Sequence, residues 1–99
     1  MKAKIFDYEN AGANLRRVFG DNFGGSTITI YTVCDHVSKS GMSRNIKCFV
    51  VWNGEVINLG YGRVSGCGMD MGYHVAEGVF STAYPQAKSE NLVFIHRWV

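Results

Sequence analysis

The chain has little of several features that mark specialised classes of protein. Only three cysteines occur among its 99 residues, at irregular spacing and without a CxxC pair. An odd number at such spacing argues against a disulfide framework and fits a reducing cytoplasm. No signal peptide opens the chain, and no apolar run is long enough to cross a bilayer. We therefore expect a cytoplasmic protein that makes no contact with a membrane.

The chain also has little excess of positive over negative charge. The formal net charge is only +2, too small for a general nucleic-acid binder, and a DNA mimic should be strongly acidic. The positive excess is nevertheless local. Against Glu55 alone, the segment 36–66 carries four cations, which are Lys39, Arg44, Lys47 and Arg63.

No internal repeat, low-complexity tract or linker divides the chain, so residues 1–99 form a single domain. A chain this short buries only about two-thirds of the surface that it exposes when unfolded. Self-association would bury more of that surface, and we therefore expect a homo-oligomer.

Hydrophobic patterns predict helices and short strands in an order that indicates an α+β fold. The sharpest signal is Asn53-Gly54, because both central residues of a tight hairpin turn need positive φ. Helices are predicted over 7–19 and from about Asp70 to before Pro85, and strands over 27–33, 46–52, 55–61 and 92–99. Polar or glycine-rich connections are predicted over 34–44 and 60–72. The start of the chain, through Ile5 and Phe6, is either a short strand or an arm.

The natural arrangement of these elements is a small antiparallel sheet, of three to four strands, with the main helix packed on one face. The second helix is this main helix, because its apolar residues fall on one face at helical spacing. Those residues are Val75, Ala76, Val79, Phe80 and Ala83. The helix over 7–19 is a further, N-terminal element.

The run from His36 to Arg44 suits an anion, above all a phosphate. Its hydroxyls and cations can contact the anion, and Gly41 allows a tight turn that presents backbone N–H groups. The alternative is an ordinary solvated loop. The predicted contacts are His36, Ser38, Lys39, Ser40, Ser43 and Arg44.

The glycine-rich connection leads into the start of a helix, where unpaired N–H groups favour negative charge. Backbone N–H groups around Gly66 and Gly68 would complete the anion site, with Arg63 just upstream. Asp70 could instead cap the helix and occupy that position. Neither a Walker spacing nor a GxGxxG fingerprint is present, so no nucleotide cofactor is expected.

A small set of side chains could support catalysis. Asp70 and His74 are four residues apart on the polar face of the main helix, so Asp70 could orient His74 as a general base. His36 would join them only if the fold brought it near. The alternative is a solvent-facing polar stripe. We expect no metal site, because no recognised ligand spacing is present.

Two runs together, HVSKSGMSR (36–44) and GCGMDMGYH (66–74), followed by Tyr84-Pro85, resemble a family of small proteins encoded by phages and prophages. The resemblance covers roughly residues 27–85. It implies an accessory protein that acts in the cytoplasm of the bacterial host, and proteins of this kind often neutralise host defence.

The first functional hypothesis is therefore a non-enzymatic anti-defence protein. It would bind either a host or defence protein, as anti-CRISPR proteins do, or a phosphate-bearing nucleotide signal. The second is a small nuclease or phosphoesterase that uses His36 or His74 as its base, Asp70 as its orienting group and Arg44 as an anion clamp. The third is a sequence-tolerant nucleic-acid binder, with bases stacking on aromatic residues in the strands. Those residues are Tyr31, Phe49, Trp52 and Tyr61.

Overall fold

The computed structural model describes residues 4–21, 27–66 and 70–98. It confirms the α+β class, with two α-helices, one short 3-10 helix and a four-stranded sheet. The elements in chain order are α1 (Tyr8–Phe19), β1 (Ile28–Val37), β2 (Ser43–Trp52), β3 (Glu55–Ser65), α2 (Met71–Ala83), η1 (Ser89–Asn91) and β4 (Leu92–Trp98).

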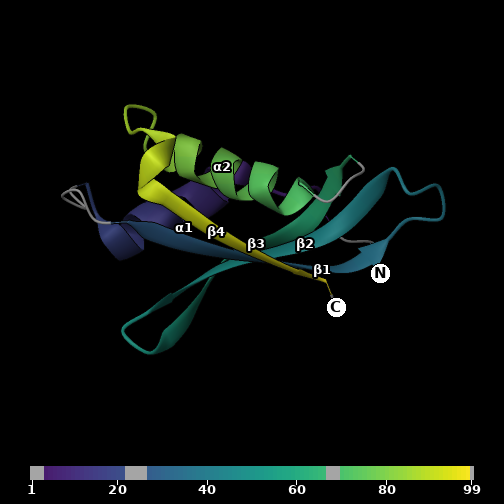
Figure 1. The fold of residues 1–99 in the computed structure, drawn as a ribbon, viewed down its shortest axis with the longest axis horizontal. Coiled ribbons are helices and arrows are strands. Elements are labelled where there is room, and N and C mark those ends of the chain that lie inside the picture. The colour runs from purple at the N-terminus through teal and green to yellow at the C-terminus, as the bar shows by residue number, and fades with distance from the viewer. Residues whose placement is uncertain (1–3, 22–26, 67–69, 99) are drawn as a thin grey trace.

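The strands lie in the order β3-β2-β1-β4. β1, β2 and β3 are antiparallel neighbours, as expected, but β4 runs parallel to β1. The expectation of a wholly antiparallel sheet was therefore wrong for its last strand. The reason is the crossover: α2 carries the chain back along the sheet after β3, so β4 runs in the same direction as β1 (Figure 1).

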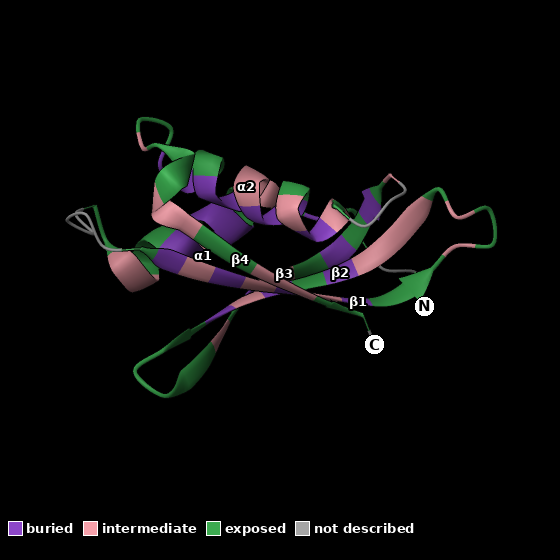
Figure 2. Ribbon diagram, in the orientation of Figure 1, coloured by how far each residue is buried: buried purple, intermediate pink, exposed green. Residues whose placement is uncertain are grey.

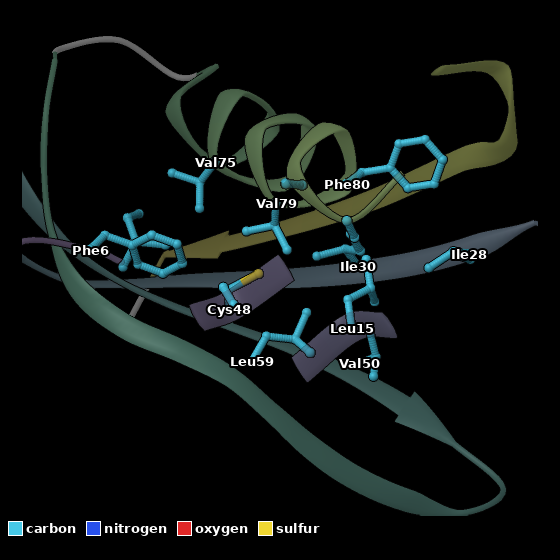
Figure 3. Close-up of a cluster of buried hydrophobic side chains, with 14 of the residues drawn as sticks. Phe6, Leu15, Ile28, Ile30, Cys48, Val50, Leu59, Val75, Val79 and Phe80 are labelled. Carbon is cyan, nitrogen blue, oxygen red and sulfur yellow. The ribbon is translucent and has the colours of Figure 1, made fainter. Parts of the chain in front are cut away.

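Both helices lie on the same side of the sheet (Figure 1). The core fills the space between them and the strands, and it is buried on this side only (Figures 2 and 3). The predicted apolar face of α2 is confirmed, since all five of its residues are buried.

Cys34 and Cys48 also lie in this core, and burial raises the pKa of Cys48 to about 12. Within the described residues, no helix is long and apolar enough to span a membrane.

Residues 4–6 form an arm that meets the sheet at an isolated bridge between Ile5 and Arg63. Asp7 caps α1 by accepting a hydrogen bond from the backbone N–H of Asn10 at 3.0 Å. Before it, Lys4 and Phe6 pair with the backbone of Arg63 at the outer edge of β3. The arm therefore covers part of one edge of the sheet.

The strands extend further than their patterns predicted. The connection predicted over 34–44 shrinks to residues 38–42, and β3 continues through the glycines at its end to Ser65. Glycine suits positions 60 and 62 of this strand because the N-terminal arm packs closely against them. A Cβ at Gly62 would lie only 2.6 Å from the Phe6 Cα. The Asn53-Gly54 turn is confirmed, with φ of 52° and 81°.

Candidate ligand-binding face

One face of the sheet carries side chains that point away from both helices, and we call it the open face. Alternation along the strands decides which residues belong to it. In β2, for example, Ile46 and Cys48 are buried beneath the helices, whereas Lys47 between them is exposed. The central part of the open face is formed by Tyr31, Val33, Asp35, His36, Ser43, Asn45, Lys47, Phe49, Asn58, Tyr61, Arg63, Ser65, Ile95 and Arg97.

A polar row crosses the open face near the ends of β1 and β3. His36 is paired with Asn45, and Asn45 is paired with Arg63. His36 and Arg63 are both exposed. The backbone N–H of Arg63 donates to the carbonyl oxygen of Lys4 at 2.8 Å, so its backbone is held while its side chain faces solvent. The structure thus brings together two predicted anion contacts from different motifs, His36 and Arg63.

The next row contains two more cations. Lys47 lies between Tyr61 on β3 and Val33 on β1, and Val33 is in turn paired with Arg97 on β4. Asp35 is exposed at a bulge in β1, where its carboxylate accepts a 3.5 Å hydrogen bond from the Tyr61 hydroxyl. Among the described residues of the open face, the cations are thus Lys47, Arg63 and Arg97, and Asp35 is the one carboxylate.

Aromatic rings occupy the centre of the open face. Tyr31 on β1 and Phe49 on β2 are directly paired, with ring centroids 5.3 Å apart and an interplanar angle of 12°. Ile95 lies beside Tyr31 and Asn58 beside Phe49. Trp52, the fourth aromatic residue of the nucleic-acid hypothesis, does not lie on this face. It points to the helix side, where its ring contacts Phe19 edge-on at 4.8 Å.

Hydrogen bonds within the chain engage four backbone N–H groups in and next to the β1–β2 loop, residues 38–42. The N–H of Gly41 donates to the carbonyl of Ser38, and that of Ser38 to the carbonyl of Ser43, both at 2.9 Å. The N–H of Met42 donates to Ser40 Oγ, and that of Ser43 to Ser38 Oγ. These serines therefore hold the turn together. Lys39 is exposed beside them.

Arg44 points away from the loop and from the open face. It alternates with Asn45, so it lies on the helix side, where its guanidinium stands 4.8 Å from the centre of the Trp98 ring. Beside it, His96 Nδ1 is 2.7 Å from the hydroxyl of buried Thr32. The Arg44 side chain thus packs at the end of the core, on the opposite side of the sheet from His36 and Arg63.

Acid should destabilise the protein through His96. Burial, and secondly the charge of Arg44, lower the pKa of His96 below its usual value of 6.5. In the pH range between the folded and unfolded pKa values, the unfolded chain binds more protons, so the free energy of unfolding falls as the pH is lowered through this range. Urea unfolding at several pH values measures this fall. We expect a smaller fall for His96→Gln, and an equal fall in both proteins would contradict the assignment.

The two motifs meet at the base of the β1–β2 hairpin. Ser43 is paired with Ser65, and the N–H of Gly66 donates to the carbonyl of Met42 at 2.8 Å. Gly66 has a φ of 138°, which favours glycine. Gly68, the other predicted glycine of the anion site, lies outside the described residues.

His36 lies apart from the other two candidate catalytic residues. His36 belongs to the open face, whereas Asp70 and His74 belong to α2 on the opposite side of the sheet. Asp70 occupies the N-cap position of α2, but its side chain makes no capping hydrogen bond. Within residues 4–21, 27–66 and 70–98, no cluster of three or more histidine, cysteine or acidic residues could hold a metal ion.

Several residues of the open face were not among the predicted site residues, among them Asn45, Lys47, Asn58 and Arg97. Their signal was present in the alternation of polar and apolar residues along each strand. Comparisons of the chain with protein-family models, with curated proteins and with solved structures found no match.

Proposed function

We propose that this protein is a non-enzymatic binding protein that holds a phosphate-bearing ligand on the open face of its sheet. One observation carries the proposal. Lys47, Arg63 and Arg97 come from three different strands, yet they lie on one face, in the two rows next to a stacked aromatic pair. Cationic side chains make charge-assisted hydrogen bonds to phosphate that are about twice as strong as neutral ones.

Several features support binding rather than turnover. The open face offers hydrogen-bond donors from Arg63, Lys47 and Asn45, whereas Asp70 and His74, the pair of the enzyme hypothesis, lie on the other side of the sheet from these donors. Binding needs only positioned donors and charge, which rigid strands supply.

The resemblance to phage and prophage proteins supports a setting for this activity. In the cytoplasm of a bacterial host, a small phage protein that withholds a nucleotide signal or covers a nucleic acid would counter host defence. In this proposal the protein binds its ligand without changing it, so the effect of the protein depends on how much of it is produced.

The experiment that tests the proposal measures fluorescence anisotropy with two probes, a fluorescent nucleoside triphosphate and a labelled single-stranded oligonucleotide of about 12 nucleotides. We expect at least one probe to bind, and Arg63→Gln to weaken it by about fivefold or more, since each phosphate contact contributes to affinity. Arg17→Gln is the control, because Arg17 is exposed on α1, away from the open face.

Two outcomes would overturn the proposal. Either neither probe binds, or Arg63→Gln and Arg17→Gln bind as tightly as the unaltered protein. The first outcome would favour the other ligand expected from the sequence, a host or defence protein.

A further inference from the structure

We infer that the ligand of the open face is a single-stranded nucleic acid, whose bases stack on the Tyr31–Phe49 pair while its phosphates contact Lys47, Arg63 and Arg97. This inference rests on the proposed function and names the class of ligand.

The aromatic pair is suited to stacking. Tyr31 and Phe49 lie on the two central strands, and their nearly parallel rings are both partly exposed. Flat bases add to such a stack on an outer ring face, and the interaction tolerates any base because every base has a π-face. Tyr61, which is 46% exposed, offers a third ring one row away.

The placement of the cations indicates a ligand with more than one phosphate along a chain. Arg63 is on β3 and Arg97 on β4, at opposite edges of the sheet. Three steps between neighbouring strands separate them, which is about 14 Å at the usual strand spacing. Separate phosphates of a strand of several nucleotides that crosses the sheet can contact both side chains without the two arginines having to bend toward each other.

Lys47 lies where such a strand would pass. It is two residues from Phe49 along β2 and on the same face, so the Cα atoms of the two residues are about 7 Å apart. A base stacked on Phe49 therefore brings its own or the next phosphate within reach of the Lys47 ammonium. Asn58 and Asn45, in the rows on either side, add amide groups that can bond to base edges or to phosphate.

The same geometry favours a single strand over a duplex. In a duplex the faces of the bases are stacked on one another and cannot reach the rings. Duplex readers usually insert a helix or a two-stranded ribbon into a groove, but both α-helices of the described chain lie on the other side of the sheet (Figure 1). Exposed aromatic rings on a sheet are instead the usual platform for unpaired bases.

The test compares three labelled probes by fluorescence anisotropy in one buffer: the single strand of about 12 nucleotides, its duplex and a nucleoside triphosphate. We expect the single strand to bind about tenfold more tightly than either of the others. The double substitution Tyr31→Leu and Phe49→Leu keeps apolar side chains in the strands. It should weaken binding of the single strand about tenfold or more, because the rings can no longer stack.

Trp52→Leu is the matched control, since Trp52 is 44% exposed but points to the helix side. Circular dichroism of each variant reports whether it is folded. A second measurement needs no variant: an oligonucleotide with 5-bromouracil, irradiated with the unaltered protein, should cross-link to Tyr31, Phe49 or Tyr61. Cross-links confined to residues outside the open face would overturn the inference.

Failure of the inference is distinguishable from failure of the proposed function. If the triphosphate or the duplex binds as tightly as the single strand and Arg63→Gln weakens that binding, the inference is wrong and the proposed function stands. If the folded leucine variant binds the single strand as tightly as the unaltered protein, stacking is wrong and only the charge contacts remain. If no probe binds, both are wrong.

Discussion

Gly72→Ala is expected to destabilise the protein by about 3 kcal/mol, at the upper end of the usual cost of overpacking a core. A Cβ at Gly72 would overlap the imidazole of His96 and the hydroxyl of Thr32. Thr32 is fully buried in the central strand β1, so it cannot move aside. The first turn of α2 would have to lift from the sheet. Urea unfolding, monitored by circular dichroism, measures the loss.

The size of this effect would be informative because alanine is otherwise the better helix former, by about 1 kcal/mol. Ser81→Ala, at an exposed position of the same helix, is the control and should change stability little. In a His96→Ala background the cost of Gly72→Ala should shrink, because part of the space is then free. If Gly72→Ala is as stable as the unaltered protein, the close packing of α2 on His96 is wrong.

The double substitution Lys47→Glu and Arg63→Glu is expected to abolish most of the binding to a single-stranded oligonucleotide, by about 100-fold or more at about 0.1 M salt. Two favourable phosphate contacts become two repulsive ones. The slope of log K against log salt should also fall, by about 1.4 for two phosphate contacts on a single strand. Both side chains are exposed, so thermal unfolding should change little.

The matched control changes the net charge equally but outside the open face. Arg17→Glu and Lys88→Glu replace exposed cations on α1 and in the connection before η1. We expect this control to lose only a small part of the affinity, since exposed charges more than about 10 Å away are largely screened. Equal losses in the two double variants would show that net charge alone drives binding, and would contradict the assignment of the open face.

The net charge of the whole chain, only +2, argues against nucleic-acid binding. Net charge describes the whole chain, whereas a ligand meets one surface. Residues Lys47, Arg63 and Arg97 are separated by up to 50 positions in the sequence, and strand pairing places them on one face, where Asp35 is the one opposing carboxylate in the described part of the chain. The charge of that face is therefore clearly positive although the charge of the chain is almost balanced.

The polar loop shows the opposite case, in which residues adjacent in sequence are placed on different sides of the sheet. Arg44 and Ser43 are neighbours, but alternation along β2 sends their side chains to opposite sides of the sheet. The serines at 38 and 40 bind the backbone of their own turn. Because the strands extend to Val37 and from Ser43, the loop between them contains only residues 38–42.

The sequence by itself determined the features that depend on near neighbours. The Asn53-Gly54 turn, the cap at Asp7 and the apolar face of α2 each follow from a few adjacent residues, because turn geometry, capping and helical spacing are local properties. Only the tertiary structure decided the direction of β4, the placement of both helices on one side, and hence which side chains form the open face. These depend on how distant strands pair and on which face the helices bury, and no local pattern contains that information.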